Sequence, residues 1–116
     1  MEQPHFFYHI VTPSQWEAFA DSIYYEAASL HTEGFIHCSA TGQLEATMNR
    51  YYKGEPTVLL LKIEAAKLSA ELKYELAPSV NDYFPHIYGQ LNKDAITEVT
   101  EVHALADGSF SLADFF

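Results

Sequence analysis

The stretch TVLLLKIE, residues 57–64, is the strongest strand signal in the chain and decides the class of fold. Its apolar residues are consecutive rather than alternating, which is typical of a strand buried on both faces. It is much shorter than the roughly 20 apolar residues of a membrane helix, and Lys62 interrupts it. We therefore predict a central strand at residues 57–64, inside a sheet of a soluble domain.

Two shorter strands are predicted on the N-terminal side of this segment. FFYHIV (6–11) and GFIHCS (34–39) are rich in β-branched and aromatic residues, as strands usually are. The segment YYEAASLH (24–31) fits either a strand or a loop, and its pattern does not choose between them.

Two helices are predicted in the same half of the chain. Thr12 followed by Pro13 is the usual combination of an N-cap and a first helical residue. The second helix begins at residues 39–41, continues to residue 52 and ends at KGEP (53–56), where Gly and Pro stop it.

On the C-terminal side the pattern predicts further strands and a turn. ELKYEL (71–76) and ITEVTEVHAL (96–105) alternate as strands with one solvated face do. The elements together predict a small α+β fold in a single domain, residues 1–116, with a mostly antiparallel twisted sheet of about six strands and two main helices. The remaining segments are a connector at 65–68, a loop at 77–83, a short strand after Pro85 within FPHIYGQL (84–91) and a turn at Asp107-Gly108.

The composition and net charge limit which kinds of partner this domain is expected to bind. There are 16 acidic residues against six Lys and Arg, a formal net charge of −10, and Arg50 is the only arginine. Nucleic-acid binding usually requires a basic surface, so no nucleic-acid partner is expected. The N-terminus lacks the features of a signal peptide, and the single Cys38 permits no internal disulfide. We therefore expect a cytoplasmic protein without a membrane partner.

Three of the six histidines lie inside short apolar runs: His9 in FFYHIV, His37 in GFIHCS and His86 in FPHIYG. Burying an unpaired polar group costs about 1–3 kcal/mol, so each ring must be hydrogen-bonded or otherwise used. We expect three such segments in one small domain to line a shared cleft. The alternative for each ring is a core histidine that donates to a backbone carbonyl.

Side-chain alternation along these strands places aromatic groups beside the rings. His37 shares a face with Phe35 and with the hydroxyl of Ser39. Such a face suits a planar small molecule that stacks on aromatic rings and is oriented by a few polar groups. The aromatic residues on the His86 face are Phe84 and Tyr88.

Glu33 and Glu75 are the carboxylates placed to act with these histidines. Glu33 directly precedes the second histidine strand, and Glu75 lies in a half-buried strand from which it could reach the same cleft. A carboxylate beside an imidazole can orient the ring, stabilise a developing cation or act as a base. An exposed charge at a strand edge is the alternative for both. Cys38 points away from His37, which disfavours a Cys–His nucleophilic pair.

The histidines also raise the question of a metal. Zinc accepts three His ligands plus water in catalytic sites. The segments contain no HxH or HxxxH pair, so the local spacing does not support a metal site and no metal is expected.

A distinctive order of motifs runs along nearly the whole chain: YHI, a Trp, EGFIHCS, a helix, LLLKI, KYE, FPHIYG and DGSF. This order resembles a bacterial family known as domain of unknown function 952. The most specific signatures are residues 33–39 (EGFIHCS) and 84–89 (FPHIYG).

A first-strand His followed by a Gly-aromatic-x-His-x-Ser strand and a helix is also similar to the ADP-ribosyltransferase superfamily, in particular to its RNA 2′-phosphotransferase branch. This remoter resemblance implies an ADP-ribosyltransferase-like fold, with NAD or a related nucleotide as the cofactor or ligand. It assigns His9 to the NAD ribose and His37 to the position against nicotinamide, with Ser39 following. Glu75 or His86 would fill the third position.

The resemblance implies catalytic roles for His37, Glu75 and His86. The chain departs from the phosphotransferase branch because that branch holds phosphate with arginines, whereas this chain has only Arg50 and is acidic. RNA chemistry is therefore not expected, and cleavage of a glycosidic bond in NAD or a related nucleoside derivative is the physical alternative. The expected ligand-binding residues are His9, Ser39, Glu33, Phe84 and Tyr88.

Four functions stay open on the sequence. The first is an ADP-ribosyltransferase-like enzyme or pseudo-enzyme that binds NAD, and the second is a small-molecule binding module without turnover. The third is a metal-dependent hydrolase that uses the histidines. The fourth is a structural domain in which these rings only pack.

Overall fold

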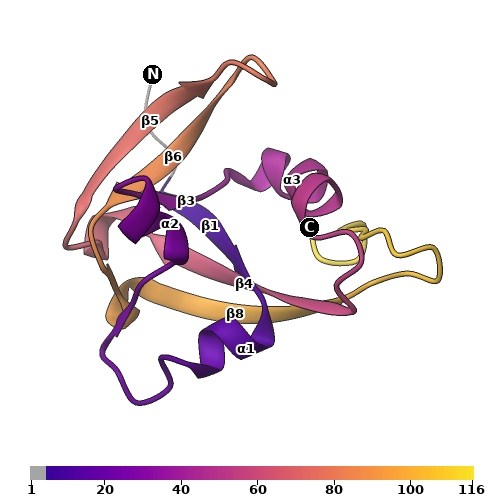
Figure 1. Ribbon diagram of the computed structural model, residues 1–116, viewed down its shortest axis with the longest axis horizontal. Coiled ribbons are helices and arrows are strands. Elements are labelled where there is room, and N and C mark those ends of the chain that lie inside the picture. Colours follow the sequence, from indigo (N-terminus) through magenta and orange to yellow (C-terminus); the bar gives the residue numbers. More distant parts are fainter. Residues whose placement is uncertain (1–4) are drawn as a thin grey trace.

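The computed structural model describes residues 5–116, which form three small antiparallel sheets (Figure 1). The first sheet has the strand order β1 (Phe6–Val11), β4 (Thr57–Glu64), β8 (Ile96–His103). The second sheet pairs β2 (Tyr24–Tyr25) with β7 (Leu91–Asn92). The third sheet has the order β3 (Ile36–His37), β6 (Asp82–Tyr88), β5 (Glu71–Ala77). Residues 1–4, on which the expectation of no signal peptide partly rests, lie outside the described residues.

Short helices connect the strands. The α-helices are α1 (Pro13–Glu17), α2 (Ala28–Thr32) and α3 (Leu44–Tyr51). The 3-10 helices are η1 (Thr41–Gln43), η2 (Ala65–Lys67) and η3 (Lys93–Ala95). The α+β class and the antiparallel pairing are confirmed, whereas the expected single sheet is replaced by three.

β4 is the central strand of the first sheet, as the sequence predicts. It pairs with β1 on one side and with β8 on the other. Leu59 and Leu61 pack into a cluster shared with the third sheet, whereas Val58 and Leu60 pack into a second cluster beneath α3. Both faces of β4 are therefore buried, which explains its consecutive apolar run.

The second cluster holds α3 against the first sheet. Leu44 and Met48, one helical turn apart, are fully buried there. Tyr52, just beyond the helix, donates its hydroxyl to the backbone oxygen of Ile10 at 3.1 Å. The opposite face of α3 is left to line the cleft described below.

A backbone junction joins the first sheet to the third. The amide of Tyr8 donates to the Ser39 carbonyl at 2.8 Å, and the amide of Ser39 donates to the Tyr8 carbonyl at 2.8 Å. Ser39 lies just beyond β3, so this pair brings β3 alongside β1. Figure 1 shows β5 and β6 as a long hairpin that rises above the first sheet, with α2 and α3 on either side of β1.

The segment around residues 24–39 differs most from its prediction. The ambiguous stretch 24–31 forms β2 and then most of α2, whose N-cap Ala27 makes no side-chain cap hydrogen bond. The strand expected at 34–39 is shortened to β3, Ile36–His37. Gly34 has a φ of 92°, which lets the chain turn out of α2. Beyond His37, Cys38 still donates to the Pro85 carbonyl of β6, and Ser39 then pairs with Tyr8 of β1.

The strand expected after Pro85 begins earlier, and the loop expected at 77–83 is correspondingly shorter. β6 starts at Asp82 and runs through Pro85. The Pro85 carbonyl accepts from the Cys38 amide at 3.0 Å, so the ring nitrogen of Pro85 faces the edge where β3 has ended. The missing N–H points away from β5 and therefore removes no hydrogen bond from the β5–β6 ladder, so β6 tolerates the proline.

Other local predictions are confirmed. Thr12 caps α1 with Pro13 at its start, and the connector at 65–68 contains η2. β5 and β8 lie where their alternation predicts them. The turn at Asp107-Gly108 has Gly108 at a φ of 84°.

Gly89, at the end of β6, generates a stability prediction. Its φ is 155°, and a Cβ there would lie 2.9 Å from the Cβ of Ala70. We expect Gly89→Ala to lower the free energy of unfolding by about 1–3 kcal/mol, measured by urea denaturation. Gly42→Ala is the matched control, because Gly42 has no positive φ and open space around its Cα. Equal free energies of unfolding for the two variants would contradict the argument that the backbone angle and the close approach of Ala70 require a glycine at position 89.

Candidate functional site

His9, His37 and His86 line one cleft of about 1260 Å³. α2 and α3 supply its walls, and residues 76–80 of the β5–β6 hairpin lie over it. Ligand pockets usually measure about 300–1,000 Å³, so this cleft has room for an extended small molecule. The three histidine segments, far apart in the sequence, therefore converge.

His9 forms the buried floor of the cleft and is 6% exposed. Its Nδ1 lies 2.7 Å from the His37 carbonyl, which only accepts, so Nδ1–H is the donor. The Tyr25 hydroxyl, 3.2 Å from Nε2, then donates to that nitrogen. Burial lowers the pKa of His9 to about 4, so the ring is neutral near pH 7 with one defined tautomer.

Tyr25 is a cleft residue that the sequence reasoning missed. Its ring packs near His9, Trp16 and Phe19, with centroids 5.2 to 5.8 Å away. Burial raises the pKa of its hydroxyl, which therefore stays protonated as the donor to His9. Its one sequence signal is the aromatic pair at 24–25, and the ambiguity of that segment concealed it.

His37 lies at the open side of the cleft, with 52% of its side chain exposed. Its Nε2 is 3.1 Å from Oε2 of Glu33, which also lines the cleft. The Phe35 ring contacts His37 at a centroid distance of 4.8 Å, as the strand alternation predicts. The motif at 33–39 thus forms a compact unit of carboxylate, aromatic ring and imidazole.

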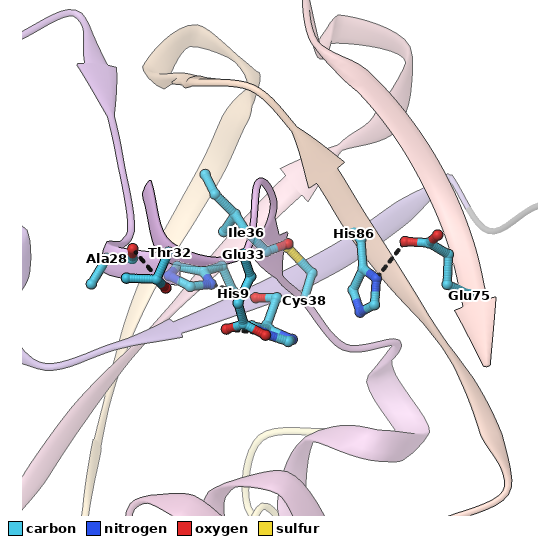
Figure 2. Close-up of polar contacts among 9 residues, drawn as sticks. His9, Ala28, Thr32, Glu33, Ile36, Cys38, Glu75 and His86 are labelled. Atoms are coloured by element: carbon cyan, nitrogen blue, oxygen red, sulfur yellow. Dashed lines mark hydrogen bonds and ion pairs between the residues drawn. The ribbon is translucent and has the colours of Figure 1, made fainter. Parts of the chain in front are cut away.

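His86 is held by a carboxylate on the neighbouring strand. Figure 2 shows Glu75 of β5 beside the His86 ring, with Nδ1 2.8 Å from Oε1. The Tyr88 hydroxyl donates to the same oxygen at 2.6 Å, and this bond, followed by that to His86, lowers the pKa of Glu75. The carboxylate therefore accepts from Nδ1–H, and in the neutral ring Nε2 carries the lone pair. Nε2 has no hydrogen-bond partner among residues 5–116.

Phe35 joins the His37 and His86 strands on one face of the third sheet. Its ring stacks on His86 with centroids 4.2 Å apart and an interplanar angle of 21°. The rings of His37 and His86 are 5.2 Å apart, edge to face. Tyr88 contacts the same Phe35 ring at 5.3 Å. Both histidines are therefore fixed in orientation by one aromatic group.

The predicted site residues occupy two zones. His9, Glu33, His37, Ser39, Phe84 and His86 line the cleft. Glu75 and Tyr88 lie behind His86 and are not among the lining residues, and the expected contact of either with a ligand stays a prediction. Their contacts act on the orientation of His86.

The rim carries a further His–carboxylate pair. His31 Nε2 lies 2.7 Å from Glu26 Oε1, and both residues line the cleft. A hydrogen bond from Gln90, followed by that from His31, lowers the pKa of Glu26. The side chain of His31 is 68% exposed at this rim.

Two other kinds of site would depend on the Cys38 thiol as a nucleophile or on a cluster of metal-ligating side chains. Cys38 is buried, and burial raises the pKa of its thiol, so the thiolate nucleophile is disfavoured. Within residues 5–116, no group of three His, Cys, Asp or Glu side chains is arranged to hold a metal ion. Among the helices formed by these residues, none has the length and apolarity that crossing a bilayer requires.

Comparison with known proteins places the chain in a family. A family model described as "Protein of unknown function (DUF952)" matches residues 10–99. The chain belongs to the DUF952 family. No curated protein matches it. The family resemblance inferred from the motifs is therefore confirmed, whereas the comparisons say nothing of ADP-ribosyltransferases.

Solved structures of a bacterial protein share this fold. The crystal structure of protein CC0527 from Caulobacter crescentus is 31% identical, with a TM-score of 0.84, covering 94% of this chain and 96% of that chain. The solution structure of CC0527 is 30% identical, with a TM-score of 0.82, covering 97% of each chain. Both are structural-genomics targets whose names state no activity.

The buried His9 generates a pH prediction. Its pKa is about 4 in the folded state against 6.5 ordinarily, so the unfolded state binds a proton first as the pH falls. Stability from this group is therefore present above pH 6.5 and lost between pH 6.5 and 4. Between pH 7 and 4.5 we expect wild type to lose roughly 2–3 kcal/mol more than His9→Gln in urea denaturation. Equal losses of stability in the two proteins would mean that folding does not lower the pKa of His9.

Proposed function

We propose that the cleft binds NAD or a related nucleoside derivative and that the protein cleaves the N-glycosidic bond of this ligand. The observation that carries the proposal is the convergence of His9, His37 and His86 in one cleft. The motif order similar to ADP-ribosyltransferases requires the first two of these residues to meet. The arrangement of two small antiparallel sheets joined at Tyr8 and Ser39 supports the same reading.

The groups in the cleft suit a ribose and a flat cationic ring. The Tyr25 hydroxyl gives its proton to His9, so its oxygen keeps acceptor capacity for a ribose hydroxyl at the floor of the cleft. Phe84 offers an aromatic side chain along the wall. Glu26 and Glu33 make that side of the cleft acidic, which favours the positive charge of an oxidised nicotinamide.

The chemistry assigned to the chain centres on His86. NAD supplies a bond whose cleavage releases nicotinamide with the bonding electron pair and leaves positive charge at the ribose carbon. The free Nε2 of His86 is placed to take the proton of the attacking water or acceptor hydroxyl as its oxygen bonds to that carbon. Glu75 is a positioning residue that holds the Nδ1–H tautomer and stabilises the imidazolium formed. Glu33 orients His37 at the open side of the cleft.

Ligand binding is tested by a thermal-shift titration of metal-free protein with NAD, ADP-ribose, nicotinamide and zinc. We expect NAD and ADP-ribose to raise the Tm, because a ligand at 100 times its Kd stabilises the fold by about 2.7 kcal/mol. His37→Ala should reduce that shift, whereas the control His103→Ala should keep it, because His103 is exposed and pairs with Glu101 outside the cleft. A shift with zinc alone would instead support the metal-dependent hydrolase.

Turnover is tested separately by nicotinamide release. Glu75→Gln should lower the rate about 10²–10⁴-fold, the usual contribution of an acid–base group, while NAD affinity changes little. The tautomer of His86, followed by ¹⁵N NMR, should become mixed in the same variant. The matched control is Glu71→Gln on the same strand, which neutralises an exposed carboxylate that does not contact His86. NAD binding without nicotinamide release in wild type would make this protein a binding module.

A further inference from the structure

Arg50 stands out among the residues of the cleft. It is the only arginine of the chain, lies in the last turn of α3 and lines the cleft. No lysine is among the lining residues, so within the described part of the chain Arg50 is the one permanent cation there. It also makes no ion pair with any residue between 5 and 116. A cation in the last helical turn interacts favourably with the helix dipole. That interaction would be the same on a helix face outside the cleft, so it does not explain why Arg50 lines the cleft.

The helix directs Arg50 to this position. Gln43, Thr47 and Arg50 are spaced by four and three residues and line the cleft together. Leu44 and Met48 occupy the opposite, buried face. The helical face that lines the cleft therefore carries polar side chains at Gln43, Thr47 and Arg50. Its positive charge lies at the C-terminal end of α3.

The remaining walls carry the opposite charge. Glu26 and Glu33 line the cleft from the segments that flank α2, and Asp82 lines it from the start of β6. Glu45 is the only carboxylate of α3 and is used elsewhere, since it accepts from the Leu112 amide at 2.8 Å. In a chain with a net charge of −10, an anionic group entering the cleft meets a favourable charge only at Arg50.

We infer that Arg50 is the phosphate anchor of this cleft, so that its substrates are phosphate-bearing nucleotides rather than free nucleosides. This inference rests on the proposed function and adds the substrate class. A guanidinium presents paired N–H donors that match two phosphate oxygens, which a lysine cannot reproduce. The diphosphate would lie along the α3 wall, while the cationic ring would lie on the acidic side.

The experiment compares three ligands that differ in phosphate. Isothermal titration calorimetry with nicotinamide riboside, nicotinamide mononucleotide and NAD is performed on wild type, Arg50→Ala and Arg50→Lys. Wild type should bind the mononucleotide and NAD at least about tenfold more tightly than the riboside. Arg50→Ala should remove that preference by weakening NAD while leaving riboside affinity within about twofold, and Arg50→Lys should restore part of it.

Lys53→Ala is the matched control, because it removes one positive charge near Arg50 but outside the cleft. It should leave all three affinities unchanged. The phosphate-binding role of Arg50 is wrong if Arg50→Ala leaves NAD affinity unchanged or weakens the binding of NAD and of the riboside equally. The proposed ligand class would stand in either case.

A second readout separates the anchor from the proposed function. Inorganic pyrophosphate is added to ¹⁵N-labelled protein, and the side-chain Nε–H signal of Arg50 is followed by NMR. A saturable shift of this signal supports the anchor, even where no nicotinamide ligand binds and the proposed function fails. An unchanged signal together with equal affinities for the three ligands overturns the inference.

Discussion

The backbone pair between Tyr8 and Ser39 is the interaction on which the rest of the site depends. It joins the first sheet to the third through two hydrogen bonds of 2.8 Å. Next to it, the His9 ring donates to the His37 carbonyl at 2.7 Å. Each such bond contributes only about 0.5–1.5 kcal/mol net, but together they determine which residues of two distant segments face each other. The cleft exists because the sheets meet here and separate on either side.

Burial then gives chemically similar side chains different properties. His9 is enclosed and stays neutral, whereas His37 is half exposed beside Glu33. His86 is enclosed by Phe35 but keeps a carboxylate on Nδ1. One residue type thus provides a buried ring with both nitrogens hydrogen-bonded, an accessible ring and a ring oriented by a carboxylate, and the differences follow from desolvation and pairing. Family membership and the close structural match to CC0527 establish the shared fold, but a fold does not determine an activity.

Predictions of elements from local signals were mostly right, and the elements that were missed depend on long-range contacts or lack a local signal. β4 was recognisable because both of its faces are buried, and α1 because Thr12 and Pro13 define its start. α2 was missed because its N-cap makes no side-chain hydrogen bond and its five residues show no helical period. The early start of β6 was missed because a proline is unusual inside a strand, and it is acceptable here only because its nitrogen points away from β5.

The sequence by itself determined the antiparallel α+β class, the central strand and the residue types available for chemistry, because propensity and periodicity are local properties. The tertiary structure alone decided that His9, His37 and His86 meet, that Glu75 and Tyr88 lie behind His86, and that Tyr25 and Arg50 belong to the cleft. These relations depend on strand register and on the junction at Tyr8 and Ser39. Such contacts join residues far apart in the chain, and no local spacing encodes the distance between them.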